Sequence, residues 1–314
     1  MASGMSATVT IMNILKQGDH VLCIDDVYGG TQRYLKKILC PNFGIELTMS
    51  DFSDIKEFKK CLKKNTKLVW LETPTNPTLK IFDIEAIAKA LKGTGIIFVC
   101  DNTFATPVWQ TPAQLGADIV MHSVTKYLGG HSDVVMGALV TQDAEIDHAL
   151  RTIQNNCGAI AQPFDSFLVL RGLKTLHLRI ERHCANGRKI AHWLKAHDGV
   201  GKVYWPGFED HPGHAIAAKQ MDDFGGMIAF EIASNDLDQA KNLAASTKLF
   251  ALAESLGGVE SLIEHPAAMT HASIPAKDRD KLGISDGFIR ISVGVEDAQD
   301  LIADLDQAFE KAGI

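Results

Sequence analysis

Two short stretches of the chain place an acid and a lysine where both can act on one small ligand. Residues 97–103 form an apolar run that ends on Asp101, and residues 123–126 set Lys126 behind two hydroxyl side chains. A further strand-like run lies between the two stretches. Pyridoxal phosphate (PLP) requires such a pair, an amine that forms a Schiff base and a carboxylate that holds the ring nitrogen protonated. Asp101 and Lys126 therefore predict a site for this cofactor.

Strands and helices alternate along the first half of the chain, which predicts an α/β fold. The expected strands are residues 20–25, 45–49, 67–72, 97–101, 118–122 and 137–141, with helices at 31–40, 54–64 and 83–91. This alternation favours a mostly parallel sheet with both faces covered, in which ligands bind beyond the carboxyl ends of the strands. The side chains that follow such ends, and that we expect on one rim, are Tyr28, Asn76, Asp101, Ser123 and Lys126.

Three segments near this rim carry groups that suit contact with a ligand. A turn at Ser3 and Gly4 begins an apolar helix, so its free N–H groups suit an anion, although a plain N-cap is the alternative. Tyr28 lies beside two glycines, which suits stacking of its ring on a flat ligand. A half-buried tyrosine in a loop is the alternative interpretation. Residues 73–77 form a turn in which two prolines fix the backbone and aim Asn76.

The second half of the chain has an α+β pattern. Helices are expected at residues 143–157, 162–197 (lightly broken), 236–246 and 296–312, and strands at 202–204, 226–232, 249–251 and 288–293. A helix as long as 162–197 often bridges two domains. We therefore expect a large cofactor-binding domain at residues 1–177 and a smaller domain at residues 178–314.

Arg290 lies inside an otherwise apolar strand of this second half, so it must find an anion. The partner is either a structural carboxylate or the carboxylate of a substrate bound by both guanidinium nitrogens, and we favour the substrate. Glu254 and Ser255 lie in a Gly-rich, exposed-looking loop that adds an acid and a hydroxyl.

Composition excludes several other classes of protein. The net charge of −7 argues against a nucleic-acid partner, and the lysines at 59, 60, 63, 64 and 67 are typical of a solvated helix face. No apolar stretch reaches the roughly 18 residues that span a bilayer, so we expect no membrane partner. The first residues do not resemble a signal peptide, and six scattered cysteines without a C-x-x-C pair indicate reduced thiols. These features predict a cytoplasmic enzyme.

Other chemistries lack their motifs. The sequence has no P-loop, no dinucleotide fingerprint after a strand and no G-x-S-x-G elbow. The histidines at 122, 131, 211, 214, 265 and 271 show no spacing typical of metal ligands. We therefore expect no metal site.

Ten motifs together resemble the cysteine/methionine-metabolism branch of the fold-type-I PLP-dependent enzymes. They are residues 2–8 (ASGMSAT), 26–31 (DVYGGT), 72–77 (ETPTNP), 101–104 (DNTF), 123–127 (SVTKY), 130–137 (GHSDVVMG), 171–176 (RGLKTL), 253–258 (AESLGG), 269–272 (MTHA) and 289–294 (IRISVG). The resemblance covers essentially the whole chain. It implies a mostly parallel seven-stranded sheet flanked by helices, with a smaller α+β C-terminal domain.

The resemblance also implies a role for each candidate residue. Lys126 would bind the cofactor covalently, Asp101 would hold the ring nitrogen, and Tyr28 would stack on the ring and transfer protons. The phosphate would be held by the backbone N–H groups of Gly4 and Met5 and by the hydroxyls of Ser123 and Thr125. The substrate would be bound by Asn76, Ser255 and Arg290, with Glu254 favouring a polar tail.

The implied reaction is γ-elimination of L-cystathionine to L-cysteine, 2-oxobutyrate and ammonia, with hydrogen sulfide released from cysteine as a side activity. The alternatives are γ-replacement, as in a γ-synthase, and β-elimination. Members of the family assemble as homotetramers, as dimers of dimers.

Family members also carry a longer segment before the Ser-Gly turn, with a tyrosine and an arginine that reach the neighbouring subunit's phosphate. The sequence begins almost on the turn, so we expect a fragment or a shortened form. A shortened, inactive form that assembles with full-length subunits is the rival hypothesis.

Overall fold

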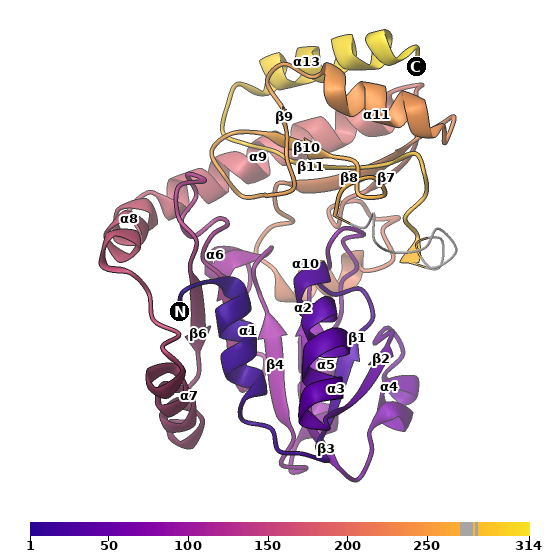
Figure 1. The fold of residues 1–314 in the computed structure, drawn as a ribbon. Coiled ribbons are helices and arrows are strands. Elements are labelled where there is room, and N and C mark those ends of the chain that lie inside the picture. Colours follow the sequence, from indigo (N-terminus) through magenta and orange to yellow (C-terminus); the bar gives the residue numbers. More distant parts are fainter. Residues whose placement is uncertain (271–278, 280–281) are drawn as a thin grey trace.

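The chain folds around two sheets, one from each half of the sequence (Figure 1). The structure is a computed structural model, and it describes residues 1–270, 279 and 282–314. His271 and Ala272 of the MTHA motif lie outside the described residues. None of the helices in the described ranges is long and apolar enough to cross a membrane.

The larger sheet holds its strands in the order β2-β1-β3-β4-β5-β6. They are β1 (His20–Ile24), β2 (Glu46–Ser50), β3 (Thr66–Glu72), β4 (Ile97–Asp101), β5 (Ile119–Ser123) and β6 (Gly137–Val140). All neighbours run parallel except β5 and β6, which are antiparallel. β1 is buried along its whole length and β3 almost so, as expected for a sheet covered on both faces.

The expected seventh strand is absent from the described residues, so that part of the prediction is wrong. The described residues form six strands, and β6 lies at one edge of the sheet. Along that edge the backbone of Met1 alone exchanges hydrogen bonds with Gly137 of β6, at 2.9 and 3.0 Å, among the described residues. One residue paired in this way does not make a strand.

Helices surround the larger sheet (Figure 1). They are α1 (Gly4–Met12), α2 (Gly29–Tyr34) with the π-helical turn Leu35–Leu39, α3 (Cys40–Phe43), α4 (Ile55–Cys61), α5 (Ile84–Leu91), α6 (Thr106–Trp109) and α7 (Ala144–Cys157). The lysines of and beyond α4 lie at the surface, where Lys60 pairs with Glu57 and Lys63 with Glu46. All five lysines are exposed as predicted, but only Lys59 and Lys60 lie on a helix, because α4 ends at Cys61 and Lys67 lies on β3. All six cysteines are free thiols.

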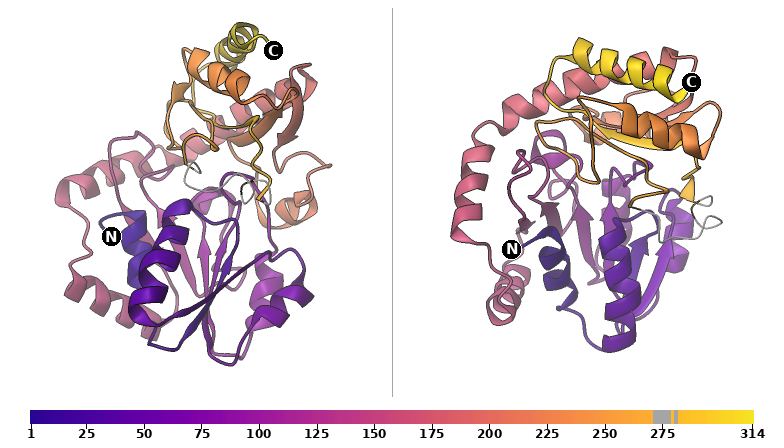
Figure 2. Two further views of the ribbon diagram at one scale, coloured as in Figure 1. Left: turned by 45° about the vertical axis from the view of Figure 1, so that its right-hand side comes forward. Right: turned by 45° about the horizontal axis from the view of Figure 1, so that its top comes forward.

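The smaller sheet has the order β7-β8-β11-β10-β9 and is antiparallel except between β9 and β10. Its strands are β7 (Val200–Tyr204), β8 (Met227–Ile232), β9 (Ala251–Leu252), β10 (Leu262–Glu264) and β11 (Phe288–Ser292). The remaining helices are α8 (Pro163–Leu173), α9 (Leu176–Ala196), α10 (His214–Gln220), α11 (Leu237–Ser246) and α13 (Ala298–Ala312). Figure 2 shows α9, α11 and α13 against this sheet and α8 on the flank of the molecule.

The long helix α9 joins the two halves. The Arg179 guanidinium donates to the carbonyl of Tyr127, just beyond β5, at 2.7 Å. The His183 ring, one turn later, contacts the carbonyl of Val293, just beyond β11, at 2.6 Å. The predicted break in the 162–197 helix falls at residues 174–175, between α8 and α9. A domain boundary near residue 177, at the start of α9, stays our proposal.

Candidate active site

The carboxyl ends of β4 and β5 are tied together by a threonine that lies between the two strands. Asp101 ends β4 and is 6% exposed. Its Oδ1 accepts hydrogen bonds from the Thr103 hydroxyl at 2.5 Å and from the Thr103 backbone N–H at 3.0 Å. The same hydroxyl accepts the N–H of Ser123 at 2.9 Å. Burial raises the pKa of Asp101 to about 6, and the two bonds from Thr103 oppose that shift.

Lys126 follows in the turn after β5, and its backbone N–H donates to the carbonyl of Ser123 at 3.2 Å. The Lys126 amine reaches across to the smaller domain, where it donates to the Ser255 hydroxyl at 2.9 Å. Burial, together with the positive charge of Arg290, lowers the pKa of Lys126 to about 8. The neutral amine, which is the nucleophilic and basic form, is therefore available near physiological pH.

The N-terminus of α1 lies against the same strand end. Ser3 is the N-cap, because its side chain accepts the N–H of Ser6 at 2.9 Å. The N–H groups of Gly4 and Met5 precede that of Ala7, which donates to the Ser3 carbonyl at 3.0 Å, and they point outward from the helix start. A Cβ added to Gly4 would lie 2.9 Å from both Cβ and Oγ of Ser123, so the helix start approaches β5 closely. Two backbone donors and a hydroxyl thus meet at one point, which suits an anion.

The Thr125 hydroxyl forms hydrogen bonds within the protein. Its hydroxyl donates to the carbonyl of Met136 at 3.2 Å and accepts the Met136 N–H at 3.1 Å. The expected bond from Thr125 to a phosphate would have to replace the bond that it donates to Met136. The Thr125 assignment stays a prediction.

Tyr28 lies just before α2 and is 44% exposed. Its backbone N–H donates to the Glu72 carboxylate at 2.9 Å. Glu72 is buried at the end of β3 and is directly paired with Asp101 in the parallel β3–β4 register. Sequence reasoning missed Glu72 and Thr103. The available signal was that two neighbouring strands each end on an acid.

Arg290 joins the two domains. Its Nη1 donates to Oδ1 of Asn76 at 2.7 Å, and its Nη2 donates to the carbonyls of Glu254 and Ser255 at 2.9 and 3.0 Å. Asn76 is nine-tenths buried in the TPTNP turn, and the peptide bonds before both of its prolines are cis. A second acid, Asp26, accepts the hydroxyls of Thr75 and Thr78 in this turn.

The partner of Arg290 is a structural carboxylate. Glu264 is fully buried on β10, opposite Arg290 in the antiparallel register, and its Oε1 lies 3.1 Å from Nη1. Glu264 thus supplies one anion from within the protein, and the expected contact of Arg290 with a substrate carboxylate stays a prediction. Burial raises the pKa of Glu264 to about 7, against the effect of Arg290. Nε of Arg290 is buried and has no hydrogen-bond partner among the described residues, where one donor of the guanidinium therefore stays unused.

These residues fit PLP. The buried carboxylate, the low-pKa amine and the anion-binding helix start lie beyond adjacent strand ends, and an unused guanidinium donor lies beside them. Each group matches one part of the cofactor or of an amino-acid substrate. In the described part of the chain no three His, Cys, Asp or Glu side chains cluster as metal ligands do.

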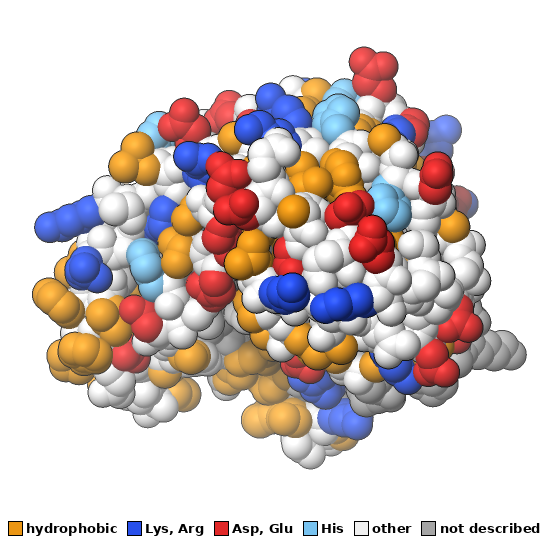
Figure 3. All heavy atoms as spheres, turned by 90° about the horizontal axis from the view of Figure 1, so that it is seen from above, with side chains coloured by type: hydrophobic (Ala, Val, Ile, Leu, Met, Phe, Trp, Pro, Cys, Tyr) orange, Lys and Arg blue, Asp and Glu red, His pale blue; other side chains and the backbone are white. Residues whose placement is uncertain are grey.

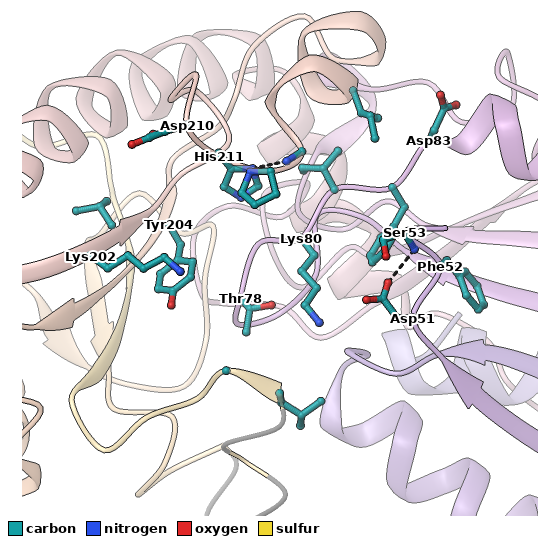
Figure 4. A pocket seen from close by; sticks show the side chains of 18 of the residues that line it. Asp51, Phe52, Ser53, Thr78, Lys80, Asp83, Lys202, Tyr204, Asp210 and His211 are labelled. Atoms are coloured by element: carbon teal, nitrogen blue, oxygen red, sulfur yellow. Dashed lines mark hydrogen bonds between the residues drawn. The ribbon is translucent and has the colours of Figure 1, made fainter. Parts of the chain in front are cut away.

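A cavity of about 790 Å³ lies between the two domains (Figure 4). Figure 4 shows Tyr204, Lys202 and His211 on one wall and Thr78, Lys80 and Phe52 on the other. None of the predicted site residues lines it. It is therefore separate from the rim that holds Asp101 and Lys126.

Comparisons with known proteins show which family the chain resembles. The model of the family "Cys/Met metabolism PLP-dependent enzyme" matches residues 1–310. A cystathionine γ-lyase of Dictyostelium discoideum is 52% identical over 99% of this chain and 80% of its own length. A cystathionine β-lyase of Coxiella burnetii is 53% identical over 98% and 80%. The crystal structure of a cystathionine γ-lyase from Lactobacillus plantarum, complexed with L-serine, matches with a TM-score of 0.96 and 44% identity over 99% of this chain and 81% of its own.

Fold and site together define a PLP-dependent enzyme, with a mostly parallel sheet and a smaller α+β domain. The chain belongs to the Cys/Met metabolism family of PLP-dependent enzymes.

Proposed function

We propose that the chain is a carbon–sulfur lyase that cleaves L-cystathionine by γ-elimination to L-cysteine, 2-oxobutyrate and ammonia. The observation that carries this proposal is the environment of the Lys126 amine. Burial lowers its pKa to about 8, and it donates a hydrogen bond to Ser255 across the domain junction. Relatives named cystathionine γ-lyase and cystathionine β-lyase, at about equal identity, support a lyase. Hydrogen sulfide release from cysteine would be a side activity.

Several residues of the chain would hold the cofactor and the substrate. Asp101 would face the ring nitrogen and Tyr28 would cover the ring. The phosphate would lie at the start of α1, against Gly4, Met5, Ser123 and Thr125. Asn76, Ser255 and Arg290 would orient the substrate carboxylate, with Nε of Arg290 as an available donor.

Proton transfer would fall to Lys126 and Tyr28. When bound, the cofactor supplies an electron sink that stabilises negative charge at the substrate Cα. Lys126 would remove the proton from Cα, which its lowered pKa favours. Once neutral again, Lys126 would remove a second proton from Cβ, and the Tyr28 hydroxyl or Lys126 would then protonate the departing γ-sulfur.

Glu254 favours γ-elimination over its alternatives. Its side chain is exposed at the site and close enough to Lys126 to raise that lysine's pKa, so it would meet the far end of a substrate. A carboxylate there suits the charged amino-acid tail of cystathionine. The β-lyase and γ-synthase reactions remain the alternatives within the family.

The test is product identification. Purified chain is loaded with PLP and incubated with L-cystathionine, and the keto acid is identified by mass spectrometry. We expect 2-oxobutyrate, and we expect none from Lys126→Ala. Pyruvate would instead assign β-elimination, and a chain that binds no cofactor would favour the shortened, inactive form.

We also propose a cytoplasmic homotetramer. Support for self-assembly comes from α8, where Phe164, Phe167 and Leu170 are 68%, 59% and 65% exposed. Hydrophobic side chains gather at the left edge of Figure 3, the side on which α8 lies in Figure 1. Exposed apolar patches of this kind mark interaction surfaces. Six unpaired thiols support a reducing compartment.

A further inference from the structure

Glu72 and Asp101 form a pair of buried carboxyls at the site. They are register partners at the ends of the adjacent parallel strands β3 and β4, and their exposures are 5% and 6%. Side chains paired in this way leave the sheet on the same face, close together. In the described part of the chain neither forms an ion pair with a lysine, arginine or histidine.

The side chains that act on the pKa of Glu72, or on which Glu72 acts, are Asp101 and Cys100 on β4, Cys23 on β1 and Asp26 beyond β1, and none of these is a cation. Two buried carboxyls on adjacent strands oppose each other's ionisation. A single proton held by the pair at neutral pH would remove one of the two charges.

The surroundings decide which carboxyl keeps the proton. Asp101 accepts two hydrogen bonds from Thr103, which favour its charged form. Burial and the negative charge of Asp101 raise the pKa of Glu72 well above its usual range, whereas the pKa of Asp101 rises to about 6. The proton thus lies mainly on Glu72.

Glu72 has a second function, because one of its oxygens accepts the backbone N–H of Tyr28 at 2.9 Å. The backbone of Asn76 also lies close enough to Glu72 to lower its pKa. One side chain therefore links the strand that ends beside Asp101 to the loop that carries Tyr28. A neutral carboxyl can accept this bond without adding charge.

We propose that Glu72 is a positioning residue that shares one proton with Asp101, so that the pair presents a single negative charge to the cofactor ring nitrogen, and that it fixes the backbone of Tyr28. This inference rests on the proposed placement of that nitrogen at Asp101. It assigns Glu72 no contact with the cofactor or the substrate.

The first experiment uses the chain without cofactor. The infrared spectrum of the wild type minus that of Glu72→Gln isolates the protonated carboxyl band of Glu72, which we expect at pH 7. The pH at which this band disappears should be lower in Asp101→Asn, because the like-charged neighbour is gone. An absent band, or a midpoint that Asp101→Asn leaves unchanged, would overturn the proposal. The result does not depend on cofactor binding.

The second experiment measures PLP affinity by equilibrium dialysis at pH 7.5, together with the visible circular dichroism of the bound cofactor. Glu72→Gln mimics the neutral carboxyl and keeps an oxygen for the Tyr28 N–H, so its affinity should stay within about threefold of the wild type. Glu72→Leu leaves that N–H unpaired and should weaken binding roughly fivefold or more, with an altered dichroism band. Glu57→Gln, a surface acid, is the control.

Equal affinity and dichroism for the Gln and Leu variants would contradict the positioning role. A large loss in Glu72→Gln would show that Glu72 acts as an anion, which contradicts the shared proton. If the wild type bound no PLP, the proposed function would fail, while the infrared result on the carboxyl pair would still stand.

Discussion

Lys126 is half-buried, with its amine on the Ser255 hydroxyl and near the positive charge of Arg290, and this environment sets its chemistry. Its pKa of about 8 lies below the ordinary value of 10.5, so the folded chain binds fewer protons than the unfolded chain between those two values. Burying the charged amine therefore costs stability below pH 8, and that cost disappears as the pH rises.

We expect an amine-directed reagent to label Lys126 in the cofactor-free chain with a midpoint near pH 8. Peptide mapping by mass spectrometry across pH 6–11 gives the midpoint. Ser255→Ala removes the hydroxyl that accepts from the charged amine, so its midpoint should fall slightly. A midpoint near 10.5, the ordinary value for lysine, would contradict the buried environment.

The Arg290–Glu264 pair gives a second prediction at the scale of residues. Arg290→Met leaves a fully buried carboxylate unpaired, which should lower the free energy of unfolding by roughly 3–5 kcal/mol at pH 8. Glu264 has a pKa of about 7 that Arg290 holds down, so without Arg290 the folded chain takes up a proton and loses less stability at pH 5.5 than at pH 8.

Urea unfolding at the two pH values measures this effect. The double variant Arg290→Met/Glu264→Gln should recover part of the loss and lose its pH dependence, because no unpaired charge remains. A single variant with the same deficit at both pH values would be inconsistent with the role of Glu264.

At the scale of elements, α1 delivers its N-terminus to β5 only because position 4 has no side chain. Gly4→Ala would place a methyl group 2.9 Å from the Ser123 side chain, so the helix start must move away from the strand. We expect PLP affinity to fall about tenfold, while the free energy of unfolding changes by only about 1 kcal/mol. Equilibrium dialysis and urea unfolding measure the two quantities.

Ser3→Ala is the matched variant for this prediction. It removes the N-cap, at a cost of about 1 kcal/mol, without inserting a group between α1 and β5. Its PLP affinity should therefore fall less than that of Gly4→Ala. The reverse order would contradict the close approach as the cause.

The alternation of strands and helices was enough to predict the larger sheet, because each buried strand is a distinct apolar run. It was not enough for β10, whose three residues are too short to show a pattern. The partner of Arg290 was missed for the same reason, since Glu264 lies on β10 and reaches Arg290 only through sheet register. Glu72 likewise became visible only when β3 and β4 were placed side by side.

At the scale of the whole molecule, the flank formed by α8 exposes several large apolar side chains to water. Phe164 and Phe167 stack there with ring centroids 6.4 Å apart and stay exposed in a single chain. We expect Phe164→Ser/Phe167→Ser to shift the protein to a smaller assembly in analytical ultracentrifugation.

Phe43→Ser is the control for this prediction. Phe43 is 54% exposed on α3, away from α8, and its replacement should leave the sedimentation of the protein unchanged. A wild-type chain that sediments as a monomer at all concentrations would contradict the proposed assembly.

The contacts of Arg290 with Asn76, Glu254, Ser255 and Glu264 also restrict how the substrate range of this chain can change by successive single mutations. A replacement at Arg290 removes its contacts to Asn76, Glu254 and Ser255 at once and leaves Glu264 unpaired, so the first step loses stability before any new substrate can bind. Among the described residues, the bond that ties Glu254 to the fold is the one that its backbone carbonyl accepts, and its exposed side chain can be exchanged. Divergence in specificity should therefore begin at Glu254, and Arg290 should change only after Glu264 has changed.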